Sequence, residues 1–258
     1  MTRIITFLSG KGGVGKTTIS SNVAEALHEA GKRVIIIDAN ITTPNLSLHY
    51  GLDEKGPSLH DVLNGKVKIN DVIYKTHTGL MVIPGGLSFN NLKTKIKKTL
   101  SKSLIDLIGK FDYIIIDASA GLGRETEMAI KASDEMVIVT NPELPAVTDA
   151  LKAKKMAEEY RVSLLGVVLN KATGLDFDLD SENISEFLEL PLLGIVPHDI
   201  NVRRSIKDRI PVVASYPDSK SSKAIKAIVN RIAGEELFIP DKPDKGFFKW
   251  FKTILGLK

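Results

Sequence analysis

An eight-residue glycine-rich segment near the N-terminus, GKGGVGKT from Gly10 to Thr17, limits the fold of this chain more than any other feature. It fits the pattern G-x-x-x-x-G-K-[ST], follows the β-branched run Arg3–Leu8 and opens the helical pattern Lys16–Ala30. Glycines let such a loop curl until its N–H groups face phosphate oxygens, and the helix start adds partial positive charge. The sequence therefore predicts a strand–loop–helix unit that binds a nucleotide.

The side chains of this loop indicate the cofactors, ATP or ADP with Mg²⁺. Lys16 is expected to neutralise the β- and γ-phosphates, and Thr17 to offer its hydroxyl to Mg²⁺. The residues predicted to contact the nucleotide here are Gly10, Lys11, Gly12, Gly13, Val14, Gly15, Lys16, Thr17 and Thr18.

Short apolar runs alternate with helical patterns along the rest of the chain. Strands are predicted at Arg3–Leu8, Arg33–Asp38, Leu80–Pro84, Tyr113–Asp117, Met136–Thr140, Leu164–Asn170 and Leu193–Val196. Helices are predicted at Lys16–Ala30, Asn91–Ile108, Glu125–Ala132, Pro145–Tyr160, Glu182–Leu188, Val202–Lys207 and Ser222–Ala233. Most of the strands are apolar at both alternating positions, as in a parallel sheet covered on both faces. The fold class is therefore α/β, one doubly wound, mostly parallel sheet with helices on both faces.

Two of the predicted strands end in aspartate, at Asp38 and Asp117. Carboxylates at the carboxyl ends of neighbouring strands lie beside the ligand in a doubly wound sheet. Asp117 is therefore the expected Mg²⁺ partner, and Asp38 a candidate catalytic residue. For both residues an N-cap at a strand–helix junction is the alternative interpretation.

Composition excludes several other chemistries. The chain has 258 residues and no cysteine, which excludes disulfides, thiolate zinc sites, iron–sulfur ligation and cysteine nucleophiles. Its longest apolar runs are too short to span a bilayer, and no signal peptide precedes the first strand, so we expect a cytoplasmic protein.

The C-terminal residues 247–258, FFKWFKTILGLK, have a different character. On a helical wheel their large apolar residues occupy one half, which is typical of a helix that lies in a membrane interface. The expected lipid contacts are Phe247, Phe248, Trp250, Phe251, Ile254 and Leu255. We therefore predict a nucleotide-binding domain over residues 1–238, a linker over 239–246 and a membrane-targeting tail over 247–258. Packing of the tail on the protein body, or docking in a partner's groove, remains open.

The net positive charge of the chain is also concentrated near the C-terminus. Residues 241–258 hold five lysines and two aspartates, so they carry three of the chain's four net positive charges. Lysines in the tail favour an anionic membrane surface. The nearly neutral remainder argues against non-specific DNA binding.

Several segments resemble the MinD/ParA family of deviant Walker A ATPases. The matching segments are KGGVGKTT with its extra Lys11, DANITTPNLSLHYGL from Asp38, IIIDASAG from Ile114, VVLNK, IVPHDINVRRS and IPVV. Together they cover residues 1–235 in order, and with the tail the chain is most similar to the membrane-binding MinD branch.

The resemblance implies a homodimer in the ATP state. Lys11 would reach the partner's bound phosphates, although an exposed loop lysine is the alternative. By the same resemblance Asn170 would contact adenine, Pro197 and Asp199 would line the base pocket, and Asn45 would lie near the active site.

One departure from the family pattern concerns hydrolysis. Many relatives carry a second acidic residue two positions after the aspartate of the second motif, where this chain has Asn40. An amide cannot accept a proton, but positioning outweighs base catalysis in phosphoryl transfer. Hydrolysis could therefore be slow, dependent on a partner or absent, and these alternatives remain open. Asp38 could also take over the role of the missing acidic residue.

The function expected from these observations is an ATPase switch. It would bind the inner face of the cell membrane reversibly and position division or other cell-surface machinery, with an unidentified protein regulator or cargo. The alternatives are a ParA-like partition ATPase that binds DNA, and a nucleotide-binding scaffold with little hydrolysis.

Overall fold

The computed structural model describes residues 1–53, 55–86 and 97–238. Its centre is one eight-stranded sheet with the order β3-β4-β2-β5-β1-β6-β7-β8. The strands are β1 (Arg3–Leu8), β2 (Val34–Asp38), β3 (Tyr74–Lys75), β4 (Met81–Ile83), β5 (Tyr113–Asp117), β6 (Glu135–Thr140), β7 (Ser163–Ala172) and β8 (Leu192–Pro197). All neighbours pair in parallel except β3 with β4, which confirms a mostly parallel sheet.

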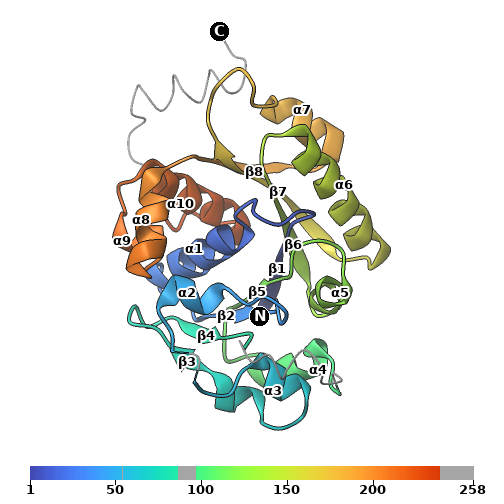
Figure 1. Ribbon diagram of the computed structural model, residues 1–258, viewed down its shortest axis with the longest axis vertical. Coiled ribbons are helices and arrows are strands. Elements are labelled where there is room, and N and C mark those ends of the chain that lie inside the picture. Colours follow the sequence, from blue (N-terminus) through green and yellow to red (C-terminus); the bar gives the residue numbers. More distant parts are fainter. Residues whose placement is uncertain (54, 87–96, 239–258) are drawn as a thin grey trace.

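Helices cover both faces of the sheet, as the doubly wound pattern predicts (Figure 1). One layer contains α1 (Lys16–Glu29), α2 (Leu46–Tyr50), α8 (Ile200–Asp208), α9 (Val212–Ser215) and α10 (Lys220–Ala233). The other contains α3 (Leu59–Leu63), α4 (Leu100–Leu104), α5 (Arg124–Ile130), α6 (Leu144–Glu159) and α7 (Ser181–Leu188). Short 3₁₀ helices lie at η1 (Ile69–Val72) and η3 (Ile105–Leu107).

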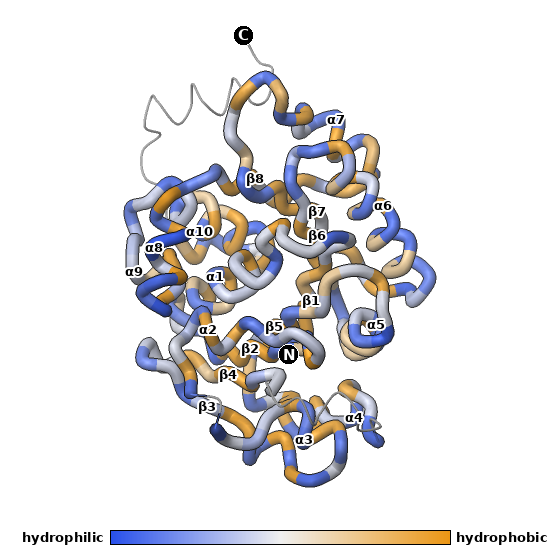
Figure 2. The backbone as a smooth tube through the Cα atoms, in the orientation of Figure 1, coloured by the Kyte–Doolittle hydropathy of each residue, from blue (hydrophilic) through white to orange (hydrophobic). Residues whose placement is uncertain are grey.

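The two faces of the sheet are buried in separate apolar layers. Every residue of β2 and β5 is buried, because each face packs on helices. Ile36 and Ile115 belong to the apolar layer that contains α1 and α10, whereas Ile35 and Ile114 belong to the opposite layer. Figure 2 shows the result as hydrophobic strands at the centre of the molecule.

The helix predicted over Asn91–Ile108 is confirmed only over part of its described range, where α4 and η3 lie. Residues 97–99 are not helical, because the N–H groups of Lys97 and Lys98 donate to the carbonyl of Leu63. Thr99 then caps α4, accepting a hydrogen bond from the N–H of Lys102, and η3 follows at once. The short elements α2, α3, α9, η1 and β3 are additional to the prediction.

The predicted tail, residues 247–258, and the whole of the predicted linker, residues 239–246, lie outside the described residues. Within the part of the chain that is described, no helix is long and apolar enough to cross a bilayer.

Candidate functional site

The glycine-rich loop connects β1 to α1 at the carboxyl edge of the sheet, as predicted. Gly15 has a φ of 91°, in the left-handed region, and a Cβ there would lie 2.1 Å from the side-chain nitrogen of Asn170. A Cβ on Gly10 would lie 2.0 Å from the carbonyl oxygen of Asp149. Both positions therefore require glycine, because the loop runs against backbone and side chains of neighbouring elements.

Two side chains at the end of β7 hold the carbonyl groups of this loop. Asn170 Nδ2 donates to the carbonyl of Val14 over 2.8 Å, and Lys171 Nζ donates to that of Gly13 over 2.6 Å. Among the described residues, the N–H groups of residues 11–15 have no acceptor. The loop thus turns its carbonyls toward β7 and keeps its donors for an anion, which fits a phosphate group.

The first residues of α1 form a buried charged cluster with the end of β5. Lys16 Nζ lies 2.6 Å from Asp117 Oδ1, and Thr17 Oγ1 donates to Asp117 Oδ2 over 2.6 Å. Ser20 Oγ also donates to Asp117 Oδ1, over 2.9 Å. The structure therefore brings together the three residues predicted to hold phosphate and magnesium.

Oxygen donors dominate this cluster. The hydroxyl of Thr17 and the carboxylate of Asp117 are the ligand types that Mg²⁺ prefers, so the residues fit that ion. No cluster of three or more metal-binding histidine, cysteine or acidic residues occurs in the described ranges. A metal would therefore need water and phosphate oxygens to complete its coordination, as Mg²⁺ commonly does.

Asp38 is fully buried at the end of β2, beside Asp117. Its Oδ1 accepts the N–H of Asn40, and its Oδ2 accepts those of Asn45 and Leu46 over 3.1 and 3.0 Å. Burial and the charge of Asp117 raise the pKa of Asp38, although the N–H donors oppose that rise. Asp38 is not the N-cap residue of α2, which is Asn45, but its carboxylate accepts the N–H groups at the start of that helix from a position next to the Lys16–Asp117 pair.

Asn40 connects the loops that follow β2 and β5. Its Nδ2 donates to the carbonyl of Thr43 over 2.6 Å, and its Oδ1 accepts the hydroxyls of Thr43 and Ser119. A second bridge joins the hydroxyl of Thr42 to the carboxylate of Glu125. The loop after β2 is therefore joined to the loop after β5 and to the first turn of α5, and the partners Ser119, Thr42 and Glu125 were not indicated by the sequence motifs.

Lys11 lies exposed on the loop, and its ammonium group has no partner among the described residues. Thr18 lies one residue further into α1 than Thr17, and its carbonyl accepts the amide of Asn22. Neither contact pattern tests the roles expected for these two residues.

The residues expected to surround adenine have structural partners in this chain. Asn170 contacts the loop, as described above, and Pro197 ends β8. Asp199 caps α8 through the N–H of Asn201 and also accepts the N–H and hydroxyl of Ser221. Contact of these residues with a base stays a prediction.

Sequence reasoning missed Ser20 and Lys171 as parts of the site. Ser20 lies one helical turn beyond Lys16, so its position follows once α1 is known. Lys171 has a φ of 58°, and this left-handed conformation has no signal in the motif itself.

The chain is similar to known nucleotide-binding proteins, both in sequence and in structure. A model of the ParA family, described as NUBPL iron-transfer P-loop NTPase, matches residues 1–233. An uncharacterized ATP-binding protein of Methanocaldococcus jannaschii is 37% identical over 98% of this chain and 96% of its own length.

Two solved structures are also similar to the chain. The septum site-determining protein MinD of Pyrococcus horikoshii, complexed with Mg-ADP, is 35% identical with a TM-score of 0.86, over 90% of this chain and 96% of that one. The MinC:MinD cell division protein complex of Aquifex aeolicus includes a chain that is 29% identical with a TM-score of 0.80, over 94% and 99%.

The doubly wound sheet, the glycine loop and the lysine–threonine–aspartate cluster define a P-loop NTPase, whose cofactors are a nucleotide and Mg²⁺. Within that class the chain belongs to the ParA family, and its relatives include MinD proteins. The resemblance seen in the motifs is thereby confirmed. The iron transfer named in the family description has no cysteine ligand to use in this chain.

Proposed function

We propose that this protein is an ATPase switch that dimerises with ATP bound, associates reversibly with the membrane and positions division or other cell-surface machinery. The single observation that carries the proposal is Lys11, an exposed cation on the phosphate loop with no partner in its own described chain. A lysine held there suits a phosphate group bound to a second protomer, so that nucleotide state and association are coupled.

Each site residue has a role in this proposal. Lys16 and the loop N–H groups bind the phosphates, Thr17 and Asp117 hold Mg²⁺, and Asp38 with Asn40 orients the attacking water. Bound Mg²⁺ would supply neutralisation of charge that develops on the phosphate oxygens. Lys16 exchanges Asp117 for phosphate when nucleotide arrives, so binding reorganises an ion pair that is already in place.

The proposed adenine contacts are Asn170, Pro197 and Asp199. Asn170 already spans from β7 to the phosphate loop, which supports a position close to the nucleotide.

Membrane association is attributed to residues 247–258, after a domain over 1–238 and a linker over 239–246. One short amphipathic tail binds weakly, whereas two in a dimer bind far better through effective concentration. Nucleotide-driven dimerisation would therefore move the protein from the cytoplasm to the inner face of the membrane.

The test is co-sedimentation with vesicles of phosphatidylglycerol and phosphatidylcholine, with ATP, with ADP and without nucleotide. The wild type should sediment with the vesicles only when ATP is present, and light scattering should show a dimer only with ATP. Lys11→Ala should stay monomeric and unbound while keeping its fold, and Lys152→Ala serves as a matched control, because Lys152 is an exposed lysine on α6. Equal sedimentation under all three conditions would refute the switch.

A protein regulator or cargo is part of the proposal, since a MinD chain among the relatives is in complex with MinC. Salt-sensitive DNA retention by the ATP form, without vesicle binding, would instead favour a partition ATPase.

A further inference from the structure

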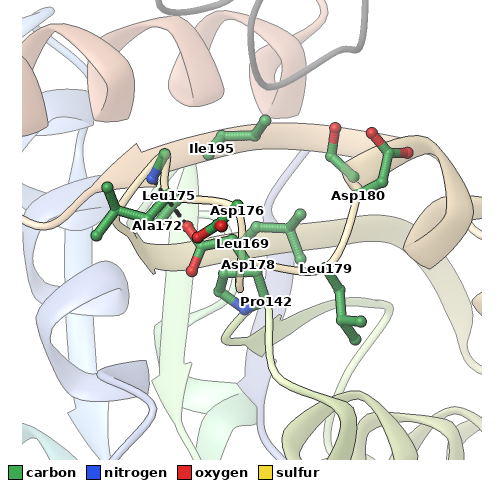
Figure 3. A pocket seen from close by; sticks show the side chains of 11 residues that line it. Pro142, Leu169, Ala172, Leu175, Asp176, Asp178, Leu179, Asp180 and Ile195 are labelled. Carbon is green, nitrogen blue, oxygen red and sulfur yellow. Dashed lines mark hydrogen bonds between the residues drawn. The ribbon is translucent and has the colours of Figure 1, made fainter.

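An apolar hollow lies at the carboxyl ends of β7 and β8, on the sheet face opposite α1 (Figure 3). Its volume is about 270 Å³, and its floor is formed by Leu169, Ala172 and Ile195. Small-molecule sites usually start at about 300 Å³, so the hollow has room for one aromatic side chain rather than a nucleotide. We call it the β7–α7 hollow.

The rim of the hollow exposes large apolar side chains. Leu175 is 56% exposed, Phe177 in the same loop 69%, and Leu179 37%. Asp178 fixes this loop by accepting the N–H groups of Thr173 and Gly174, and the N–H of Leu179 donates to the carbonyl of Pro142. The apolar side chains are thus held at the surface by a hydrogen-bonded loop.

The surroundings of the hollow are acidic. Residues 172–202 contain seven acidic residues and no lysine or arginine. Asp176 and Asp180 line the hollow itself. A ligand that combines large apolar groups with positive charges would complement this surface.

One polar atom in the wall lacks a partner. Ser181 is 1% exposed, lines the hollow, and its Oγ has no hydrogen-bond partner in the described structure. An indole N–H buried beside it needs an acceptor of this kind.

The chain's own C-terminal residues 247–258 have this complementary chemistry. They contain three phenylalanines, the only tryptophan, three lysines and no acidic residue. We propose that in the nucleotide-free protein this segment docks on the β7–α7 hollow, with Trp250 in the hollow and its lysines toward the acidic rim.

The reach of the chain allows such docking. The carbonyl of Phe238, the last described residue, accepts a hydrogen bond from the side chain of Asn230. Arg231, the neighbour of Asn230 in α10, donates to the carbonyls of Leu192 and Leu193. Those carbonyls lie on the edge strand β8, only about 10 Å before Ile195 at a rise of ~3.3 Å per residue. The eight residues 239–246 can span up to about 26 Å, enough to pass around that edge.

This inference rests on the proposed membrane function and adds its regulation. The same apolar side chains would contact either the hollow or lipid, so the two states exclude one another. A tail that is docked about nine-tenths of the time lowers the apparent affinity for vesicles about tenfold. Two residues that line the hollow, Leu169 and Ala172, lie on either side of Asn170, which contacts the phosphate loop, so nucleotide binding has a short path to the hollow.

Trp250 makes the test direct, because it is the chain's only tryptophan. Its emission and acrylamide quenching are measured in the full-length, nucleotide-free protein without lipid, with the urea-unfolded chain as the exposed reference. We expect shorter-wavelength emission and weaker quenching than in that reference. Leu175→Asp with Phe177→Asp should restore both to the exposed values and raise vesicle binding without nucleotide about tenfold.

A matched control is Ile105→Asp, since Ile105 is 61% exposed on η3, away from the hollow. It should change neither signal. Emission equal to the unfolded chain overturns the proposal, as does protection that the double variant leaves intact. Protection that disappears on dilution would identify a second copy as the occupant and also overturns it.

The two proposals fail separately. Trp250 protection that the double variant abolishes, without vesicle binding in any nucleotide state, supports docking and refutes the membrane function. ATP-dependent vesicle binding with Trp250 exposed in the nucleotide-free protein supports the membrane function and refutes docking.

Discussion

Replacing Lys16 by methionine breaks the buried ion pair on which the phosphate site is built. Lys16 and Asp117 are 5% and 2% exposed at a separation of 2.6 Å. Removing one partner of a buried pair costs about 3–5 kcal/mol, because the other charge stays buried. Asp117 keeps the hydroxyl donors of Thr17 and Ser20, so we expect the lower end, about 3 kcal/mol.

Urea unfolding of the nucleotide-free protein at pH 7 measures this loss. A domain of this size should also lose about 6–12 °C of melting temperature. Lys16→Met with Asp117→Asn should recover most of the stability, because no unpaired charge remains. Lys152→Met is the matched control, since the pair of Lys152 with Asp149 is exposed and worth less than about 1 kcal/mol.

The same variant also tests nucleotide binding. MgATP at a hundred times its Kd should stabilise the wild type by about 2.7 kcal/mol and leave Lys16→Met unchanged. A cost below about 1 kcal/mol for Lys16→Met, equal to that of Lys152→Met, would refute the buried-pair reasoning. Equal stabilisation of both proteins by MgATP would refute the phosphate role of Lys16.

Three further outcomes are expected. Burial raises the pKa of Glu25 from its ordinary 4.5 to about 7, with a contribution from Glu29. This group therefore costs stability progressively as pH rises from about 4.5 to 7, up to about 3 kcal/mol, and Glu25→Gln should melt higher than the wild type at pH 8 but not at pH 4. Gly15→Ala should abolish MgATP binding because its Cβ meets Asn170, whereas Gly109→Ala, also at positive φ but in open space, should only lose about 1 kcal/mol in urea unfolding. Asn40→Asp should raise phosphate release about tenfold or more in a turnover assay, because a carboxylate can accept the proton of water; an unchanged rate would leave Asp38 as the residue that positions water.

Patterns confined to one element were enough to predict the centre of the fold. The runs VIIID and YIIID are apolar at every position before their aspartates, and only a strand covered on both faces suits that pattern. The loop between β1 and α1 was predicted as well, because its glycines and its lysine together are typical of phosphate binding.

Short elements and tertiary hydrogen bonds were not predictable in this way. The five-residue helices α2 and α3 are too short to show a helical period, and α3 depends on a capping box between Ser58 and Asp61. The predicted helix over 91–108 fails at residues 97–99, where the N–H groups of two lysines with good helix propensity donate to the carbonyl of Leu63, and it holds over α4 and η3. Tertiary contacts decided these segments.

The site likewise has a part that the sequence motif predicts and a part that depends on tertiary contacts. The motif places Lys16, Thr17 and Asp117 together, but it gives no account of the carbonyls of the loop. Those are satisfied by Asn170 and Lys171, which are more than 150 residues away along the chain. Asn170, which we expect to contact adenine, thus also fixes the phosphate loop, so we expect its loss to weaken binding of both the base and the phosphates.

Asn40, the departure from the family pattern, occupies a structural position as well as a chemical one. Its N–H donates to Asp38 and its side-chain oxygen accepts from Ser119, so it joins the ends of β2 and β5. A carboxylate at this position would keep the acceptor for Ser119 but lose the donor to the carbonyl of Thr43. The asparagine therefore fixes the turn at residues 40–43 of its own loop more firmly than an aspartate would, but it supplies no proton acceptor. Asn40→Asp therefore changes two things at once, and Asn40→Ala separates them because it removes the donor to the Thr43 carbonyl without supplying a proton acceptor. Faster phosphate release from Asn40→Ala would assign the gain to loop opening, and release no faster than the wild type would assign it to the carboxylate.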